Sequence, residues 1–506
     1  MSERGRVVLI FAAVLLVAGG AGFYFFKIYR PAKDLENAQA ELAGWEIRWQ
    51  DARDCLLGKS PGSAKTSEAL AIHEMAPDPW DRGKCTPLIS KLTRGESTDT
   101  GIPAIETAWE ALDKAAQDAA KAFAQHVGSS TTLLADPLPS ALDALDAARA
   151  NLRTAAKLPA AERAGHPLPV AQIVQLVDGN DPVTALEIDA IPSSHGMVLF
   201  GKTANRLIQL MLTTGGAPQV ARIGATALRA VPDTSWGANA AEGEVQAGPF
   251  DGEGALSTSA SLKVKDHSTV AAVIGTTQLG TVVYGTQTQL YVAHAKDGTV
   301  AADPAIDIAW AMASTDVDGR AVVLWQSSKD KKYQGRIIRP GDDGAIVELP
   351  EALSGQPCLT KDRAWVQSNR EVFSFGGGQP LFRKEAAGEL TKLQGCSADA
   401  ALFRDVAAPK MLYICADDCR KVAVPPGAPE TAATTVVGGK LVAIAAHNGV
   451  LGVWREGGQP TFYSMPEAAQ PVLAQELTAM AMTDGKVIDI IARGAKTFVV
   501  IRIPAT

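Results

Sequence analysis

The sequence has few aromatic residues (6%), and it contains no long block of lysine and arginine. The formal net charge is −7, so a surface that follows a nucleic-acid backbone is not indicated and nucleic acid is not an expected partner. Paired CxxC motifs and closely spaced histidines, from which structural zinc sites are built, are also lacking. These absences argue against nucleic-acid-binding proteins and zinc-framework domains.

Long hydrophobic runs are absent with one exception, residues 7–26. This stretch, VVLIFAAVLLVAGGAGFYFF, carries no charge over 20 positions. As a helix rising about 1.5 Å per residue, it would span roughly the 30 Å hydrocarbon core of a bilayer. A cleaved signal peptide is the alternative, since Ala18 and Gly20 are small enough for a peptidase. The aromatic residues at 23–26 extend the run past that site and favour a transmembrane helix preceded by a cytoplasmic tail, residues 1–6.

The orientation of this helix is not decided by flanking charge, because Arg4 and Arg6 are balanced by Lys27, Arg30 and Lys33. Two other features decide it. The segment before the helix is very short, and long following domains cross a membrane largely regardless of charge. The six cysteines are even in number and lack metal-site spacing, which suits an oxidising compartment. We therefore predict a single-pass protein of the bacterial inner membrane whose bulk lies in the periplasm.

The region 31–160 is predicted to be a small α-helical domain. Residues 34–57, 104–127 and 140–158 have few helix breakers, and the first segment places apolar residues three and four positions apart. The stretch between the first two segments is expected to be partly loop, with a short helix after Cys85. These helices could pack as a bundle or form a stalk. Residues 161–168 belong to the proline-punctuated stretch KLPAAERAGHPLPVAQ and are expected to be a linker.

The region 169–506 has an all-β pattern, in which short apolar runs alternate with turn residues. Strand–turn–strand segments begin near residues 196, 280, 319, 363, 410, 449 and 486, mostly about 40 residues apart. The gap between the first two is about twice that, and a degenerate unit around residue 238 would fill it. This region resembles a β-propeller of about seven or eight blades, although it lacks WD40, kelch and quinoprotein signatures. A pair of β-sandwiches is the alternative.

The six cysteines admit 15 disulfide connectivities, and proximity along the chain favours one of them. Cys55 and Cys85 share the helical region and would close a loop of about 31 residues. Cys358 and Cys396 are about one blade period apart, so their bridge could tie neighbouring blades.

The remaining cysteines, Cys415 and Cys419, flank a three-residue loop in a predicted hairpin, where a disulfide would hold the turn. Their Cα atoms are expected about 5 to 6 Å apart. This bridge would fix how Asp417 and Asp418 face solvent, which makes these two residues a possible interaction loop. A metal or redox site is the alternative that the same spacing would suggest in the cytosol.

Other motifs are interpreted as structural. Residues 58–62 (GKSPG) match the nucleophile elbow G-x-S-x-G but lack its strand–helix context. The stretch from Asp316 to Gly319 is similar to a calcium loop, but Trp325 occupies the position of the required glutamate, so an Asp-Gly turn is expected. Asp342-Asp343-Gly344 and Asp297-Gly298 are interpreted as turns as well. The histidines are scattered and are interpreted as surface or core residues: His73, His126, His166, His195, His267, His294 and His447.

No catalytic, cofactor-binding or metal-binding residue is therefore assigned, no cofactor is implied, and whether a small-molecule ligand binds is unknown. The leading hypothesis is a membrane-anchored, non-catalytic interaction or scaffold protein of the bacterial cell envelope, with other envelope proteins as partners. The alternative is an envelope enzyme or glycan-binding propeller with a site at the channel mouth. A sensor that signals inward is disfavoured by the short cytoplasmic tail. An exposed apolar patch would favour the scaffold, whereas clustered carboxylates would favour the alternative.

Overall fold

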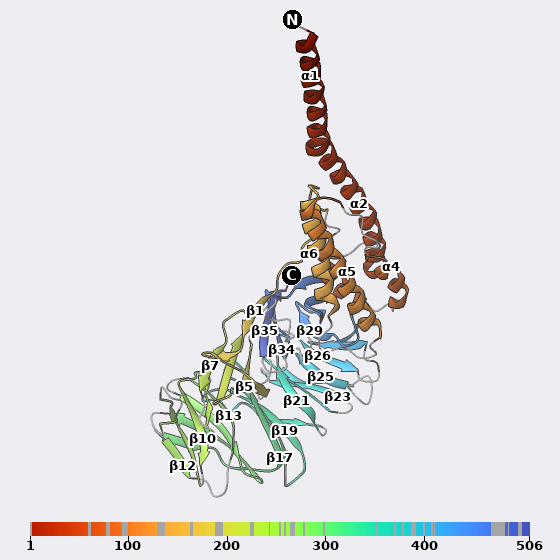
Figure 1. Ribbon diagram of the computed structural model, residues 1–506. Helices are drawn as coiled ribbons and strands as arrows, with labels where there is room; N and C mark the ends of the chain where they lie inside the picture. Colours follow the sequence, from red (N-terminus) through yellow and green to blue (C-terminus); the bar gives the residue numbers. More distant parts are fainter. Residues whose placement is uncertain are drawn as a thin grey trace. The chain divides into compact units, whose positions relative to one another are not determined.

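The computed structural model of the protein divides the chain into two compact units, residues 1–168 and residues 169–506 (Figure 1). It describes residues 3–505 except 59–61, 77–80, 94–99, 129–136, 162–164, 188–195, 223–226, 242, 252–254, 258–259, 264–268, 277–278, 297–298, 351–352, 369–370, 377–378, 386–390, 398–399, 406–407, 409, 467–480, 484 and 494–497. The predicted linker, 161–168, lies partly outside the described residues, as do residues 1 and 2 of the predicted tail.

The first unit is helical. Its elements are α1 (Glu3–Tyr24), the π-helical turn η1 (Phe25–Tyr29), α2 (Arg30–Leu57), α3 (Thr66–Met75), the 3₁₀ turn η2 (Arg82–Cys85), α4 (Thr86–Ser90), α5 (Pro103–Gly128) and α6 (Leu138–Ala155). α1, η1 and α2 follow one another without a break in the helical backbone (Figure 1). Within this continuous helix, Ala13–Leu57 is long and apolar enough to cross a membrane, judged by length and composition.

The apolar stripe predicted on α2 forms part of a single core with α5 and α6. Trp45 and Trp49 on α2 are almost completely buried and share this core with Trp109 and Phe123 of α5. The indole nitrogen of Trp45 donates a hydrogen bond of 2.7 Å to the Leu92 carbonyl oxygen, so this buried polar group has a partner. The helices therefore pack as a bundle rather than as separate rods.

The helix α3 was not predicted, because the stretch that contains it is expected from the sequence to be partly loop, with a short helix only after Cys85. Most of its residues are buried, including Thr66, Ser67 and Glu68 in its first turn and Leu70 at its centre. A helix buried on several sides shows no single apolar stripe, because polar and apolar residues alternate around it. The periodicity test therefore missed this element.

The second unit is all-β, and most of its strands form four-stranded antiparallel sheets in chain order. The first sheet contains β4 (Ala185–Glu187), β5 (Gly196–Lys202), β6 (Leu207–Thr213) and β7 (Gln219–Arg222). The second contains β8 (Ala227–Arg229), β10 (Trp236–Ala241), β11 (Glu244–Pro249) and β12 (Ala260–Lys263). A nine-stranded sheet follows, with β9 (Val231–Pro232), β13 (Thr269–Gly275), β14 (Leu279–Gly285), β15 (Gln289–Lys296), β16 (Thr299–Ala302), β17 (Ile306–Thr315), β18 (Ala321–Ser327), β19 (Tyr333–Ile338) and β20 (Val347–Leu349).

The later sheets repeat the four-stranded pattern. One contains β21 (Ser354–Leu359), β22 (Ala364–Gln367), β23 (Glu371–Gly376) and β24 (Gln379–Glu385). The next contains β25 (Thr391–Cys396), β26 (Ala401–Asp405), β27 (Met411–Cys415) and β28 (Cys419–Ala423), and it is followed by β29 (Ala433–Val437), β30 (Lys440–His447), β31 (Val450–Arg455) and β32 (Thr461–Ser464). The last sheet joins β33 (Ala481–Thr483), β34 (Val487–Arg493) and β35 (Phe498–Pro504) to β1 (Gln172–Gln175), and β2 (Val177–Asp178) pairs separately with β3 (Asp181–Pro182).

The two ends of the all-β unit meet in its last sheet. β1 lies antiparallel to β35, with Gln172 opposite Arg502, so the first and last strands close the unit by hydrogen bonding. Apolar residues of this sheet, such as Ile491 and Val500, share a core cluster with Leu199 of the first sheet. Further clusters join successive sheets along the chain. Sheets that follow in chain order, pack face to face and close on themselves define a β-propeller.

Candidate functional site

The propeller brings together one histidine and two aspartates from three segments of the chain. His294 is on β15, Asp303 follows β16, and Asp343 is in the turn after β19. One potential ligand atom from each residue lies within 4.8 Å of the others, and all three side chains are half-buried. β15 and β16 place the first two residues near each other, because His294 is opposite Ala301 in their ladder.

A buried threonine orients the imidazole ring of His294. Thr281 Oγ1 lies 3.0 Å from His294 Nδ1, and His294 Nε2 lies 3.0 Å from Asp343 Oδ1. The Gly341 backbone N–H donates to Thr281 Oγ1 at 3.2 Å. This hydroxyl, histidine and carboxylate form a chain like that of a catalytic triad, but Thr281 is 0% exposed. Its hydroxyl therefore positions the histidine and is not accessible as a nucleophile.

The two carboxyl groups of the cluster influence each other. A hydrogen bond with Asp343 raises the pKa of Asp303. Burial disfavours the charged form of Asp343, yet the hydrogen bond from Asp303 and the nearby charges of Arg336 and His294 lower its pKa. The ionisation of each group therefore depends on the other. An imidazole nitrogen and two carboxylate oxygens are also a donor set that a divalent transition metal can accept. Arg336 Nη1, 3.9 Å from Asp343 Oδ2, opposes such binding with its positive charge.

Sequence reasoning did not find this cluster. It interpreted His294 as an isolated histidine and Asp343 as part of an Asp-Asp-Gly turn. The turn does exist, because Gly344 has φ +66° and its N–H donates to Asp342 Oδ1. The available signal was the spacing of His294 and Asp303 across a short hairpin. The third member follows β19, which is separated from β15 in the same sheet by β17 and β18, so the sequence spacing of the hairpin does not show that it is a neighbour.

The predicted interaction loop lies at the tip of the β27–β28 hairpin. Cys415 is opposite Cys419 and bonded to it, and Asp417 and Asp418 are exposed. The Cα atoms of the cysteines are 4.0 Å apart, closer than the expected 5 to 6 Å. Within the loop, Ala416 N–H donates to the Asp418 carbonyl oxygen, so the adjacent cysteine pair is of the non-hydrogen-bonded kind, in which Cα atoms approach more closely. Asp418 Oδ1 accepts from the Cys419 N–H at 2.7 Å, so this carboxylate helps hold the turn.

The other cysteines are also bonded in pairs that are near each other along the chain. Cys55 at the end of α2 is joined to Cys85 in η2, with Cα atoms 5.7 Å apart. Cys358 on β21 is joined to Cys396 on β25, which ties two adjacent sheets. No free cysteine is present among the residues that the structure describes.

The loop similar to a calcium site is filled by a guanidinium group. Asp316 is completely buried, and its Oδ2 accepts from Arg320 Nε at 3.0 Å and from Nη2 at 2.6 Å. The Asp316 N–H donates to the Arg320 carbonyl oxygen, and Gly319 has φ +73°, as a tight turn requires. Arg320 thus occupies the place at which a cation would meet these carboxylates.

Among the candidates that the structure describes, the other histidines form local contacts and do not assemble into a site. His126 Nε2 contacts Glu74 Oε1 at 2.7 Å in the helical core, and His447 Nε2 contacts the Asn448 side chain at 3.1 Å. His195, His267, the turn at 297–298 and residues 59–61 of the GKSPG motif lie outside the described residues.

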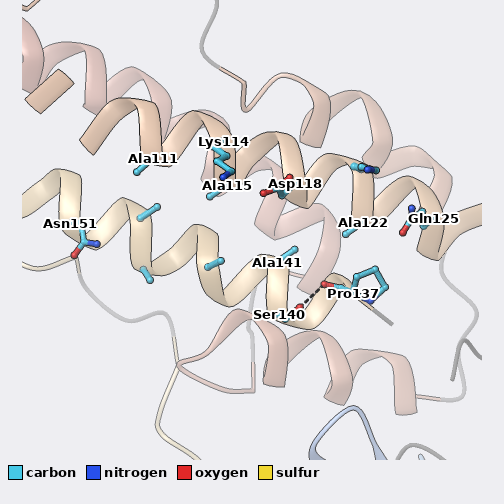
Figure 2. A pocket seen from close by; sticks show the side chains of 14 residues that line it. Ala111, Lys114, Ala115, Asp118, Ala122, Gln125, Pro137, Ser140, Ala141 and Asn151 are labelled. Carbon is cyan, nitrogen blue, oxygen red and sulfur yellow. Dashed lines mark hydrogen bonds between the residues drawn. The ribbon is translucent and has the colours of Figure 1, made fainter. Parts of the chain in front are cut away.

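A second feature lies in the helical unit, where α5 and α6 form a groove of about 730 Å³ (Figure 2). Its floor includes Ala115, Ala122 and Ala148, which are largely buried by the packing of the two helices. Charged residues such as Lys114 and Asp118 line it from α5. Small side chains on both helices leave a shallow, partly apolar channel parallel to them.

Comparisons with known proteins identify no relative by sequence: no family model matches the chain, and no curated protein matches it. Among solved structures, the WD40 domain of SCAP from fission yeast is 8% identical, with a TM-score of 0.38, over 66% of this chain and 98% of that one. BamB from Moraxella catarrhalis is 12% identical, with a TM-score of 0.34, over 66% and 98%. Hsv2p from Kluyveromyces lactis is 8% identical, with a TM-score of 0.34, over 56% and 96%. The propeller assignment stands on the strand pairing described above.

Proposed function

We propose that this protein is a membrane-anchored β-propeller that acts as a non-catalytic interaction scaffold in the bacterial cell envelope. Treating β13–β16 and β17–β20 as separate units gives a propeller of eight blades. Three parts of the chain support the proposal: the N-terminal helix, the disulfides and the groove between α5 and α6. The groove is the observation that carries the interaction role.

The N-terminal helix supports membrane anchoring. Val14, Leu15, Leu16 and Val17 are between 59% and 77% exposed, so four consecutive large apolar side chains have no cover within the protein. Such a run is stable when lipid covers it. The helix continues directly into the core of the helical unit, which would hold that unit near the bilayer.

The disulfides support an extracytoplasmic location for everything after the helix, because thiols stay reduced in the cytosol. In intact spheroplasts, after reduction, a maleimide that cannot cross the inner membrane should label the cysteines. Protection of every thiol until the membrane is permeabilised would contradict this topology. Immunoblotting of the membrane fraction for an intact N-terminus separates an anchor from a cleaved signal peptide.

We assign the groove to a helix of an envelope protein. Two parallel helix surfaces define a linear channel, and a helix is the linear element that fits it. The alanine floor allows close approach of a partner with small side chains. Lys114 and Lys121 favour acidic residues on that partner, whereas Asp118 between them favours a basic one.

A site-specific photocrosslinker in the full-length protein in native membranes tests this assignment. Ala111 and Ala124 are both exposed on α5, but only Ala111 lines the groove. Crosslinking from Ala111 should give one defined protein product that Ala124 does not give. The substitution Ala144→Trp, which fills the groove from α6, should abolish that product. Equal products from both positions, or none from Ala111, would refute the scaffold role of this surface.

The His294 cluster favours a second candidate, a propeller that binds a divalent cation as part of an enzymatic or glycan-binding site. Equilibrium dialysis of the purified protein against zinc or manganese would test it. About one equivalent of metal should bind to the wild-type protein and be lost in His294→Ala. The variant Asp342→Asn, which alters the neighbouring carboxylate in the same turn, should bind normally. Equal metal content in wild type and His294→Ala would eliminate this candidate.

A further inference from the structure

The helical unit contains a second concavity, distinct from the α5–α6 groove, with a volume of about 530 Å³. α2 contributes Arg53, and α6 contributes Asp143, Asp146 and Arg149. Lys65 lines it from the segment before α3. Alanines at 64, 150, 160 and 161 supply an apolar part of the wall. The lining therefore combines several charges with small apolar side chains.

Three of these charged groups already have partners within the protein. Arg149 Nε donates to Glu46 Oε1 at 2.9 Å. Asp143 Oδ1 accepts from the Ser67 hydroxyl at 2.6 Å. Lys65 Nζ lies 3.5 Å from Glu68 Oε1, and its side chain is 64% exposed. Their charges are compensated by these contacts or by solvent, so they do not require a ligand.

Arg53 differs from these residues. It is only 7% exposed, and its Nε is buried without a hydrogen-bond partner. Within the described part of the chain, no carboxylate forms an ion pair with its guanidinium. A buried donor without a partner is costly, because the hydration of Nε is lost and no acceptor of the protein replaces it. Arginine is also the side chain whose fork of donors best matches a carboxylate.

Asp146 and Asp54 attract Arg53 electrostatically. Burial raises the pKa of Asp146, although the nearby charges of Arg53 and Arg149 oppose this shift. The charged lining consists of Arg53, Lys65 and Arg149 against Asp143 and Asp146, so the pocket has an excess of positive charge even when both carboxylates are ionised.

We propose that this pocket binds a carboxylate-bearing ligand, with Arg53 as the residue that receives the carboxylate. The volume accommodates a group the size of an amino acid or a short chain end. The alanine wall suits a small apolar substituent next to the carboxylate. The carboxylate belongs either to a free small molecule or to the C-terminus of a peptide. The inference is independent of the scaffold role, which rests on the other groove.

Isothermal titration calorimetry with the full-length protein in lipid nanodiscs tests the proposal. The probes are N-acetylalanine, its neutral amide N-acetylalaninamide, and acetylated tetra-alanine. N-acetylalanine should bind and the amide should not. Binding of tetra-alanine as well indicates an opening that accepts a chain end, and its exclusion indicates a site for small molecules. Equal binding of the amide, or binding of none of the probes, would overturn the proposal.

Variants identify the residue responsible. Arg53→Gln should weaken binding of N-acetylalanine by about tenfold or more, the loss expected for a charge-assisted hydrogen bond. Arg53→Lys keeps the positive charge but loses the two-pronged donor geometry of the guanidinium group. Its affinity for N-acetylalanine should therefore lie between those of the wild type and of Arg53→Gln. Arg48→Gln, which removes an exposed positive charge of the same helix, α2, outside this pocket, is the matched control and should bind as wild type. Circular dichroism establishes that each variant is folded.

Asp146→Asn supplies a test with the opposite sign, which remains decisive if Arg53→Gln does not fold. Removing a negative charge near the ligand should tighten carboxylate binding by about threefold or more at pH 7 and low salt. Unchanged or weakened binding in Asp146→Asn would contradict recognition of an anion in this pocket.

Discussion

Two arginines of the propeller differ in their partners from Arg53 of the helical unit. Arg320 and Arg502 in the propeller are held by carboxylates and by backbone carbonyl groups of an adjacent sheet. In the helical unit, Arg53 is buried to a similar extent without such partners. For these three residues a charge withdrawn from solvent has two outcomes: Arg320 and Arg502 fasten one sheet to another, whereas Arg53 is the residue that we propose receives a ligand.

Two arginines illustrate the propeller pattern. Arg320 pairs with Asp316 and donates through Nη1 to the carbonyl oxygens of Thr360 and Lys361 in the following sheet. Arg502 on β35 pairs with Asp489 on β34 and donates to the carbonyl oxygens of Gly215 and Gly216, which follow β6. The second arrangement fastens the last sheet to the first. Each guanidinium group thus links two adjacent sheets that are not joined to each other by strand pairing.

The helical unit uses paired arginines as well, but on α6. Glu46 accepts from Arg149 and from Arg153, with distances of 2.6 to 2.9 Å. Burial opposes ionisation of Glu46, yet the hydrogen bonds from Arg153 and Arg149 outweigh it and lower the pKa of Glu46. The missing partner at Arg53 is therefore a local feature of one pocket and not a property of the unit.

The largest effect is expected from a substitution that breaks an arginine–carboxylate pair in the propeller. Asp489→Asn leaves Arg502 without its carboxylate at the closure of the ring, where Asp489 is 1% exposed. Removal of one member of a buried pair costs about 3–5 kcal/mol in the free energy of unfolding. Chemical denaturation of the full-length protein, followed by the fluorescence of the propeller tryptophans, should show this loss.

A surface pair provides the control for that experiment. Lys410 and Glu430 are both about 70% exposed, and Glu430→Gln should leave the denaturation midpoint unchanged. If Asp489→Asn proves as stable as Glu430→Gln, the closure does not depend on the buried pair and the contrast with Arg53 fails.

A smaller effect is expected when one disulfide bond from each unit is removed and the losses of stability are compared. By the chain-entropy model, Cys55–Cys85, which closes about 31 residues, contributes about 3–4 kcal/mol to the helical unit. Cys415–Cys419 closes about five residues and contributes about 2 kcal/mol to the propeller. When both cysteines of one bridge are replaced by serine, thermal denaturation should therefore show a larger loss of stability for the helical unit than for the propeller. The reverse order would show that native-state interactions, rather than loop length, determine the contribution.

The regular features of both units could be predicted from the sequence because they repeat. Trp45, Trp49 and Ala52 recur with the helical period, and all three are buried on α2. The recurring hairpins correspond to paired strands such as β5–β6 and β34–β35. Periodicity reports which face of an element is buried, and this information is local.

The candidate sites are not local, which is why the sequence did not reveal them. His294, Asp303 and Asp343 meet only after three segments have folded onto one another. Arg53 follows Ala52 on the stripe and is four residues from Trp49, so its burial could have been anticipated. That it lacks a partner depends on where α6 and the segment before α3 lie, and no pattern within α2 contains that information.

The smallest expected effect tests whether pairing alone, without burial, stabilises the propeller. Arg420 on β28 and Glu456 after β31 form two hydrogen bonds of 2.8 and 2.9 Å between adjacent sheets, although both are partly exposed. The hydrogen bond from Arg420 lowers the pKa of Glu456 to about 2. Because the pKa is lower in the folded than in the unfolded state, the stabilisation is complete above about pH 4.3 and disappears as the pH falls towards 2. Solvent screening limits it to about 1 kcal/mol or less. The difference in unfolding free energy between wild type and Glu456→Gln should thus shrink from pH 7 to pH 2, and a difference that stays constant with pH would assign the effect to packing instead of charge.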